Sequence, residues 1–404
     1  MSASPRSLRP GARNPGSQTA LRELNQQRIA DTLLASGPST QAELARQTGL
    51  STATISNIVR IMSDAGIVET EPTTSSGRRA LLVRLSNRGA VAVGIDFGRR
   101  HLRIAITTLG YDVVGEHLGE QTRCGLDALL GPMAHRAEEG IETASSLLAK
   151  MLADNDIAHS SVLGIGVGIP GPIDRRAGRV VQGAILPEWV GIELADLEVG
   201  LRFPVVFDND ANLGALAEVT WGPHSEIDNL VFVKVGSGIG AGLILNGRPF
   251  YGGLGITGEI GHDTITDNGV VCHCGNRGCL ETVASTSVML DLLARAGVTR
   301  VGQIVSRARA GDSATLRVLD DAGLAVGRAL ASVANLINPE VIVIGGPLAE
   351  LGDLFLGSIE RGLMRHAVPS VGESTRLVMS SLGERAEALG AAALVLQHQA
   401  VQHF

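Results

Sequence analysis

Hydrophobic and polar positions follow two different patterns, one before and one after about residue 90. Residues 21–37 place leucines and an isoleucine at roughly helical spacing and end at a Gly-Pro pair, which predicts a helix. Thr40 and Glu43 then form a Thr-x-x-Glu capping box, and Gly49 follows one short helical stretch. The front of the chain therefore begins with two consecutive short helices.

A third helix is predicted to begin after Ser51, which is a suitable N-cap residue. Its apolar positions form one stripe, which we expect to be buried, made of Ile55, Ile58 or Val59, and Met62. The glycine turn at 47–50 before it is typical of a helix-turn-helix motif, whose second helix enters the DNA major groove. The polar face of this helix supplies the candidate DNA contacts Thr52, Ala53, Thr54, Asn57 and Arg60.

Two predicted strands follow, joined by a Ser-Gly-Arg-Arg tip, which is the pattern of a DNA-binding wing. Arg78 and Arg79 at this tip are candidate phosphate contacts. Each feature alone is better explained by an ordinary helical core and hairpin. In this order they favour DNA binding.

From Val91 the pattern becomes α/β. Three consecutive strands are predicted between residues 91 and 120, followed by a helix at about 127–154 and an apolar strand beginning at Val162. A second set of strands begins at residue 204 and continues through 229–247. The repetition indicates two similar lobes with a cleft between them, a common place for a ligand.

Charge separates the same two regions. Residues 1–88 contain 11 Arg, no Lys and 6 Asp or Glu, a net charge of 11 − 6 = +5, so the rest carries −7 − 5 = −12. This asymmetry fits a nucleic-acid-binding head on an acidic body, and a solvated basic face would explain it equally well. No apolar run is long enough for a membrane span, and the start lacks a signal-peptide pattern, so we expect a cytoplasmic protein without membrane partners.

Three of the four cysteines lie within eight positions. Thiols stay reduced in the cytoplasm, where a tight cysteine cluster more often binds a metal than forms disulfides. The cluster and one upstream histidine make a complete tetrahedral set for a structural zinc ion, with no position left for water: His262, Cys272, Cys274 and Cys279. Cys124 lies outside this set and is expected to be an ordinary thiol.

Several motifs after Val91 resemble, in order and approximate spacing, those of the ROK family of repressors, open reading frames and kinases. They are GIDFG, GIPGPID, FDNDANLGALAE, VGSGIGAGLILNG, GEIGH, CHCGNRGCLE and VIVIGG. The resemblance implies an α/β, actin/hexokinase-like (RNase H-like) body with two lobes. It also implies a sugar site built from Asn209, Asp210, Glu259, His262 and Glu281, because ionised carboxylates accept hydrogen bonds from adjacent hydroxyl groups.

The nucleotide half of the resemblance is mixed. Candidate nucleotide-binding positions are Asp96, Gly236, Ser237, Gly238, Gly345 and Gly346, although glycine turns often simply close hairpins. In the family's kinases the aspartate matching Asp210 is the general base, whereas here it is a vestigial candidate. Arg99 and Arg100 replace the small residues of the kinase phosphate loop. An arginine can bind phosphate, so nucleotide binding stays open, but phosphoryl transfer, which depends on close positioning, is not expected.

The expected organisation is a disordered basic arm at 1–18, a winged helix-turn-helix domain at 19–86 and a sugar-kinase-like domain at 90–404. Its first lobe spans about 90–204 plus the C-terminal helix, and its second lobe about 205–388. These parts predict a sugar-responsive transcriptional regulator, a repressor released from operator DNA by a carbohydrate and acting as a homodimer or homotetramer. The alternative is an ATP-dependent sugar kinase with an appended DNA-binding domain.

Overall fold

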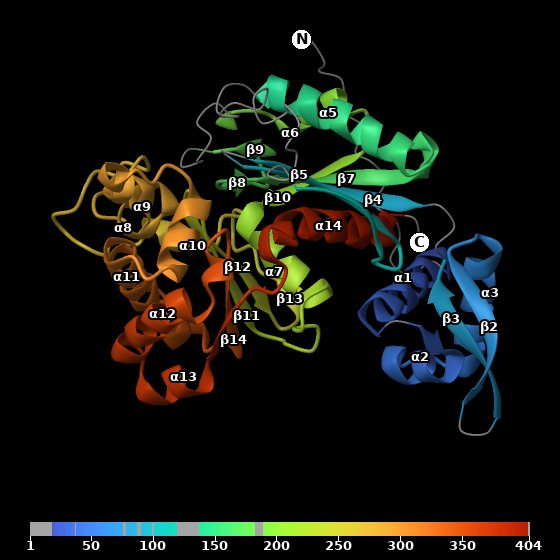
Figure 1. Ribbon diagram of the computed structural model, residues 1–404. Helices are drawn as coiled ribbons and strands as arrows, with labels where there is room; N and C mark the ends of the chain where they lie inside the picture. The colour runs from blue at the N-terminus through green and yellow to red at the C-terminus, as the bar shows by residue number, and fades with distance from the viewer. Residues whose placement is uncertain are drawn as a thin grey trace, which may run out of the picture. The chain divides into compact units, whose positions relative to one another are not determined.

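The computed structural model describes residues 18–36, 38–75, 78–86, 90–98, 101–118, 137–181 and 189–402. The chain divides into two units, one of residues 1–88 with 397–404 and one of residues 89–396 (Figure 1). The expected arm, Arg99, Arg100, Cys124 and the start of the helix expected at 127–154 lie outside the described residues, apart from the arm's last residue, Gln18. No helix in the described ranges is both long and apolar enough to span a bilayer.

The amino-terminal unit is a three-helix core with a small antiparallel sheet in the order β1-β3-β2. Its elements are α1 (Gln18–Ser36), β1 (Ser39–Thr40), α2 (Gln41–Thr48), α3 (Thr52–Asp64), β2 (Val68–Ser75) and β3 (Arg78–Leu85). The predicted capping box is present, because Thr40 Oγ1 accepts from the Glu43 amide while the Glu43 carboxylate accepts from the Thr40 amide. The short strand β1 was not predicted from the sequence.

The core of this unit comes from one face of each helix. Ile55, Ile58, Val59 and Met62 of α3 are all buried, which confirms the stripe predicted from their spacing. Gly49 ends α2 with φ of 70°, a left-handed conformation that glycine adopts at little cost. The turn between α2 and α3 is thus built as a helix-turn-helix requires.

The body contains two five-stranded sheets with the same plan, in the orders β10-β7-β4-β5-β6 and β13-β12-β11-β14-β15. In each, three antiparallel strands are extended by two parallel ones. The first sheet consists of β4 (Val91–Phe97), β5 (Leu102–Thr108), β6 (Val113–Leu118), β7 (Val162–Ile169) and β10 (Val205–Asn209). The second consists of β11 (Leu230–Val235), β12 (Ile239–Leu245), β13 (Arg248–Pro249), β14 (Val341–Gly345) and β15 (Arg376–Met379).

One strand lies in a different sheet from the one expected. The sequence pattern assigned residues 205–209 to the start of the second lobe, but β10 pairs in parallel with β7 and completes the first sheet. The expectation took the strand that begins at residue 204 as the first of a second, repeated unit, but the sequence of a strand does not show which sheet it pairs with. A small hairpin, β8 (Ile173–Asp174) with β9 (Arg179–Val180), lies between β7 and β10 in the chain.

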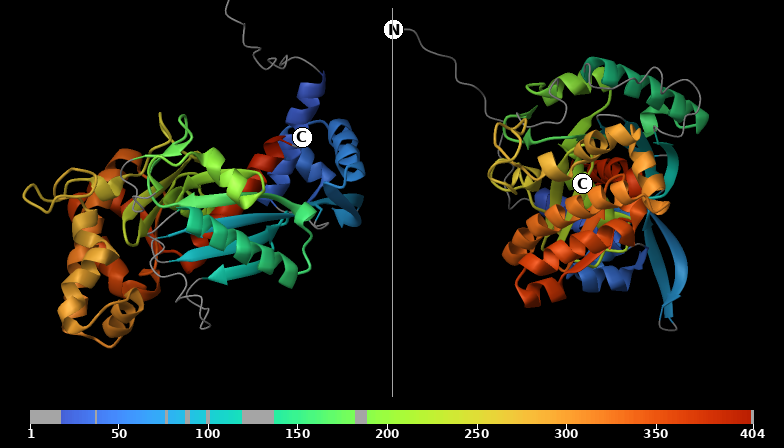
Figure 2. Two further views of the ribbon diagram at one scale, coloured as in Figure 1. Left: turned by 90° about the horizontal axis from the view of Figure 1, so that it is seen from above. Right: turned by 60° about the vertical axis from the view of Figure 1, so that its left-hand side comes forward.

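Helices cover both faces of the first sheet, as Figures 1 and 2 show, with α5 (Ala137–Asp154) and α14 (Ala386–Gln402) on opposite sides. Glycines bring α14 against the strands, since a Cβ at Gly94 would lie 1.8 Å from the Ala388 carbonyl oxygen. Within the described residues, the other α-helices of the body are α6 (Leu194–Leu201), α7 (Asp210–Thr220), α8 (Glu281–Ala284), α9 (Thr286–Leu293), α10 (Val301–Arg309), α11 (Ser313–Ile337), α12 (Asp353–His366) and α13 (Pro369–Ser374).

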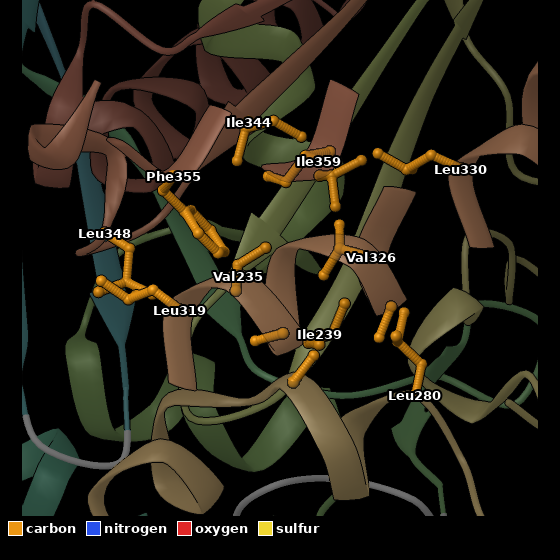
Figure 3. Close-up of a cluster of buried hydrophobic side chains, with 14 of the residues drawn as sticks. Val235, Ile239, Leu280, Leu319, Val326, Leu330, Ile344, Leu348, Phe355 and Ile359 are labelled. Atoms are coloured by element: carbon orange, nitrogen blue, oxygen red, sulfur yellow. The ribbon is translucent and has the colours of Figure 1, made fainter. Parts of the chain in front are cut away.

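The largest buried cluster packs α11 and α12 against the second sheet (Figure 3). Val235 and Ile239 enter it from the two sides of the glycine turn between β11 and β12, and Leu280 enters it from the cysteine loop. Each Val, Leu, Ile, Phe or Met side chain fully buried here contributes about 1.5 to 3 kcal/mol. The core therefore anchors two of the loops that carry candidate site residues.

Candidate functional site

A cavity of about 1120 Å³, part of it open to solvent, lies in the body. Loops at the ends of strands from both sheets line it. They include Pro170 and Gly171 after β7, Asn209 and Asp210 after β10, and residues 236–240 between β11 and β12. All five candidate sugar-binding residues line this one cavity, although they are spread over 73 positions from residue 209 to residue 281.

Asn209 and Asp210 are fixed at the junction of β10 and α7. Asn209 is the N-cap of α7: its Oδ1 accepts from the Ala211 amide at 2.9 Å, and its Nδ2 donates to the Gly171 carbonyl at 2.8 Å. Asp210 Oδ1 also accepts from the Ala211 amide, at 2.8 Å. The N-terminus of the 11-residue helix therefore holds both side chains at the cavity wall.

Lys234, whose side chain is 12% exposed, is a cation that the sequence analysis missed. Its Nζ lies 2.9 Å from Asp210 Oδ2 and 3.1 Å from Glu387 Oε1 of α14. Burial opposes the charged form, but Asp210 and Glu387 outweigh burial and raise the pKa of Lys234 above its ordinary value. The ammonium group thus joins the second sheet, the start of α7 and the start of α14.

A second ion network lies at the end of β4. Asp96 is fully buried, and its Oδ2 is 2.7 Å from His101 Nε2 and 3.8 Å from the Arg103 guanidinium, which also pairs with Glu384 at 2.7 Å. Burial would raise the pKa of Asp96, yet the charges of Lys234 and His101 hold it below its usual range. Asp96 does not itself line the cavity, whereas His101, Arg103 and Glu384 do.

Glu259 and Glu281 also line the cavity. Gly258 sets the path of the chain before Glu259, because its φ is 77° and a Cβ there would lie 1.7 Å from the Ala241 carbonyl oxygen. Glu281 Oε2 accepts from the Ile239 amide at 3.3 Å. Burial, followed by the nearby Asp210 and Glu281 carboxylates, raises the pKa of Glu259 to about 7.

The metal-ligand set predicted from spacing comes together in space. The ligand atoms of His262, Cys272, Cys274 and Cys279 all lie within 4.8 Å of one another. A tetrahedral zinc ion with Zn–S bonds of about 2.3 Å places two sulfurs about 3.8 Å apart, and the Cys274 and Cys279 sulfurs are 3.8 Å apart. These residues fit a zinc ion, which would supply structural cross-linking of the loop.

The loop is shaped for this arrangement. Gly275 and Gly278 have φ of 94° and 68°, and a Cβ at Gly278 would lie 1.7 Å from the Thr266 carbonyl oxygen. His262 directs Nδ1 toward Cys272 Sγ at 3.6 Å, while its Nε2 lies 3.7 Å from Glu259 Oε2. One imidazole therefore connects the cysteine cluster to the cavity.

His273 is another residue that the sequence analysis did not single out. Its Nδ1 lies 3.0 Å from Glu281 Oε1 and 3.8 Å from Cys272 Sγ. It orients one candidate sugar-binding carboxylate from within the cysteine loop. The sequence did offer a signal for this residue, because His273 lies between two of the cysteines predicted to bind the metal.

The candidate nucleotide-binding glycines lie in different surroundings. Gly236, Ser237, Gly238 and Gly346 line the cavity. Gly345 does not: a Cβ there would lie 2.2 Å from the ring of Phe232, so this glycine allows close core packing instead. The sequence pattern could not distinguish these two uses of glycine, because both lie at a strand end.

The polar face of α3 lies on the surface of the amino-terminal unit. Thr52, Ala53, Asn57 and Arg60 are exposed and Thr54 is half-buried. Ser51 caps the helix by accepting from the Thr54 amide at 3.1 Å, and Arg60 donates to Asn57 Oδ1 at 3.2 Å. The candidate base contacts thus form one face, as their spacing predicts.

The predicted hairpin is formed by β2 and β3, paired antiparallel from Val68 with Leu85 to Ser75 with Arg78. Arg79 is exposed near its tip, and only the backbone of Arg78 is described. Further down, Arg84 pairs with Glu69 at 3.0 Å and Glu71 at 2.8 Å. Arg79 has none of these carboxylate partners.

Comparisons with known proteins agree with the division of the chain into an amino-terminal unit and a body. Residues 23–79 match the MarR family model. Over 94% of its length the chain is 29% identical to the xylose repressor of Bacillus subtilis and 30% identical to the dual regulator NagC of Escherichia coli, covering 97% and 94% of those proteins. It is also 31% identical to a glucokinase of Halalkalibacterium halodurans over 76% of the chain and 95% of that enzyme.

A solved ROK family transcriptional regulator, described as a homologue of the Escherichia coli MLC protein, superposes with a TM-score of 0.76 at 26% identity, covering 95% of this chain and 98% of that one. The ROK family model itself matches residues 92–398, most of the chain. The cavity and the cysteine loop lie within that match, as do the two five-stranded sheets apart from Val91. The chain belongs to the ROK family and carries an amino-terminal winged helix domain of the MarR type.

Proposed function

We propose that this chain is a sugar-responsive transcriptional repressor that binds operator DNA and releases it when a carbohydrate occupies the body. One observation carries the proposal: the chain joins a winged helix unit to a body in which Asn209, Asp210, Glu259, His262 and Glu281 face one cavity. Three carboxylates and an amide suit the adjacent hydroxyl groups of a sugar. The repressors among its relatives favour the same assignment.

The proposed domains are 19–86 for DNA and 90–404 for the sugar. Thr52, Ala53, Thr54, Asn57 and Arg60 would contact bases, since Asn can read adenine and Arg can read guanine. Arg78 and Arg79 would contact phosphates. Operators of such proteins are paired half-sites, so we propose a two-fold symmetric dimer or a tetramer as the active form.

A zinc ion held by His262, Cys272, Cys274 and Cys279 would keep the loop that ends at Glu281 in place. Glu259 and Glu281 lie close to these ligands in the chain, so loss of the metal would displace both carboxylates. The role is structural, because four protein ligands complete the tetrahedron. Metal analysis of the purified chain should give about one zinc ion per chain, falling in Cys274→Ser and unchanged in Cys124→Ser.

A sugar kinase is the second candidate, favoured by the glucokinase relative and by the position of Asp210. Against it, Arg99 and Arg100 replace the small residues that a kinase phosphate loop uses to position ATP closely, and Asp210 serves equally well as a hydrogen-bond acceptor for a sugar without catalysis. We therefore propose that the chain binds sugar without phosphorylating it. The same carboxylate retains lone pairs for a sugar hydroxyl.

Calorimetric titration with D-xylose, D-glucose and N-acetyl-D-glucosamine tests sugar binding, and a sugar-phosphate assay with Mg-ATP tests catalysis. We expect at least one sugar to bind, with affinity at least about tenfold lower in Glu281→Gln and unchanged in Glu350→Gln, which lies outside the cavity. Phosphorylated product from the unmodified chain would favour the kinase. Failure of every sugar to bind would count against the sensor.

A further inference from the structure

Three polar side chains, Arg175, Asp208 and Tyr251, form a cluster within the body. Arg175 lies in the turn between β8 and β9, Asp208 lies in β10, and Tyr251 lies in the loop of residues 250–258 that follows β13. We infer that this Arg175 cluster holds the loop 250–258 against the first sheet, which makes Arg175 a positioning residue for the sugar. This role deepens the proposed function and rests on it for the identity of the ligand.

The loop 250–258 is rich in glycine. Four of its nine residues are glycines, and three of these four have positive φ. Glycine loses more conformational freedom on folding than any other residue, so the contacts of the loop have to compensate for that loss. One such contact is internal, from the Thr257 hydroxyl to the Phe250 carbonyl at 2.8 Å. The loop ends at Gly258, and the next residue is the cavity residue Glu259, so what fixes the loop also fixes this carboxylate.

Arg175 contacts the loop in three ways. Its backbone amide donates to the Leu254 carbonyl at 3.2 Å. Its guanidinium carbon lies 3.9 Å from the centre of the Tyr251 ring, within the range of a cation–π interaction. Its alkyl chain packs on Gly255, where a Cβ would lie 2.6 Å from Arg175 Cγ. The backbone, the alkyl chain and the charge of one residue thus all meet the same loop.

The same guanidinium is bonded to the first sheet. Arg175 Nη1 donates to Asp208 Oδ2 at 3.1 Å, and the Asp208 side chain is only 4% exposed. The other oxygen, Oδ1, accepts from the Asn209 amide at 2.8 Å and from Asn212 Nδ2 at 3.0 Å. One carboxylate therefore joins Arg175 to the start of α7, where Asn209 and Asp210 line the cavity.

Burial makes this ion pair costly to break. Burial raises the pKa of Asp208, although the charge of Arg175 acts against it. Burial lowers the pKa of Arg175, but the charges of Asp208 and Tyr251 outweigh burial and raise it above its ordinary value. Removing one partner of a buried pair leaves the other charge uncompensated. Without Arg175, the loop and the start of α7 would lose the residue that joins them.

The two ends of this connection carry two parts of the sugar site. Asn209 and Asp210 follow Asp208 in the chain, and Glu259 follows the loop. A sugar that bonds both parts binds only molecules in which the loop is in place, so its apparent dissociation constant rises as that fraction falls. By linkage, sugar binding must favour the bound position of the loop by the same factor.

The first experiment measures the loop in the full chain without a sugar. The loop contains three chymotrypsin sites, Phe250, Tyr251 and Leu254, and cleavage of a folded chain reports how often a segment opens. Cleavage at these sites, located by mass spectrometry, should be at least about tenfold faster in Arg175→Met than in the unmodified chain. Arg176→Met is the matched control, because Arg176 is an exposed arginine of the same turn, and it should leave the rate unchanged.

Phe355, a buried residue of α12, reports global unfolding in the same digests. Loop cleavage as slow in Arg175→Met as in Arg176→Met would overturn the inference. Cleavage after Phe355 that rises by the same factor as loop cleavage would also overturn it, because the whole body would then be loosened. If Arg175→Met does not fold, the same comparison uses Arg175→Lys, which keeps the charge but lacks the planar group over Tyr251.

The second experiment adds whichever of D-xylose, D-glucose and N-acetyl-D-glucosamine binds the unmodified chain. Its dissociation constant, measured by calorimetry, should be at least about threefold higher in Arg175→Met and unchanged in Arg176→Met. A saturating concentration should slow loop cleavage in Arg175→Met toward the rate of the unmodified chain. An unchanged dissociation constant in Arg175→Met, or loop cleavage that the sugar does not slow, would overturn the inference. If no sugar binds the unmodified chain, the sensor proposal fails, and the first experiment still decides whether Arg175 holds the loop.

Discussion

Single buried charges decide what the body of this protein can bind. Lys234 lies in an apolar strand and is one of only two lysines in the chain, the other being Lys150. It is stable there because two carboxylates from α7 and α14 compensate for its desolvation. The position that a catalytic base would occupy is thereby part of a closed ion network.

Glu218 of α7 is a buried carboxylate. Its effect on the free energy of unfolding should be measurable. Its side chain accepts from the Ser380 hydroxyl, while Oε2 has no hydrogen-bond partner among the described residues and lies 3.7 Å from His224 Nε2. Burial, with the Glu387 charge adding to it, raises the pKa of Glu218, and burial lowers the pKa of His224, so the histidine provides little compensating charge at neutral pH.

We predict that Glu218→Gln stabilises the chain by about 1 to 3 kcal/mol at pH 7, because the amide removes the cost of an incompletely paired buried charge. A raised pKa in the folded state means that protonation adds stability at low pH, which is lost as the pH rises through that pKa. The gain should therefore shrink as the pH falls toward 5. Urea unfolding at several pH values measures it.

Glu226, an exposed carboxylate that follows α7 in the chain, provides the control for this prediction. Glu226→Gln should change the free energy of unfolding by less than about 0.5 kcal/mol at every pH. A Glu218→Gln variant that is less stable than the unmodified chain at pH 7 would show that neighbouring groups fully compensate for the desolvation of the Glu218 carboxylate.

The sequence revealed some of these residues and hid others for a physical reason. His262 and the three cysteines lie within 18 positions, and their ligand chemistry is visible at that spacing. Lys234 lies 24 residues from Asp210 and 153 from Glu387. Only the packing of two sheets around α7 and α14 brings those three charges together, and no local pattern encodes it.

At the scale of elements, strand types were predictable where alternation or apolar runs were strong. The strands β4 to β7 and the hairpin of β11 and β12 lie where the pattern indicated. Sheet membership was not predictable for β10, because pairing in parallel with β7 depends on a connection across about 35 residues rather than on the strand's own sequence. The two-residue strand β1 has no periodicity to detect.

The turn before Glu259 gives a sharp test of how an element positions the site. We predict that Gly258→Ala lowers both the melting temperature and the sugar affinity, the latter at least about tenfold, because φ of 77° and the 1.7 Å approach to the Ala241 carbonyl leave no room for a methyl group. Thermal unfolding and calorimetry measure the two effects.

Gly253 lies in the same loop without a positive φ, and a Cβ there meets no atom within 4 Å. Gly253→Ala should leave the melting temperature and sugar affinity unchanged. Equal effects of the two substitutions would mean that loop flexibility, rather than the path of the chain at Gly258, controls the position of Glu259.

The wing gives a prediction about DNA. Arg79 is exposed and Arg84 is held by Glu69 and Glu71. Arg79→Ala should weaken operator binding similarly for all operator sequences and reduce the slope of log affinity against log salt by about 1, the loss of one phosphate contact. Arg84→Ala should leave the slope unchanged. A slope that is reduced in Arg84→Ala but not in Arg79→Ala would mean that Arg84, rather than Arg79, contacts phosphate.

At the scale of the whole molecule, the account depends on coupling between two units of one chain. If a sugar changes operator affinity by some factor, operator DNA must change sugar affinity by the same factor. A ligand with equal affinity for the DNA-binding and released forms would change nothing, however tightly it bound. Sugar binding alone would therefore not establish a regulator.

The most direct test is titration of labelled operator DNA with the full chain, in the absence of sugar and at a concentration that calorimetry shows to saturate the cavity. The account predicts that sugar weakens operator binding by about 5- to 150-fold, the usual range of allosteric coupling, and that Glu281→Gln abolishes the shift while keeping sugar-free operator affinity. An operator affinity unchanged at saturating sugar would contradict it.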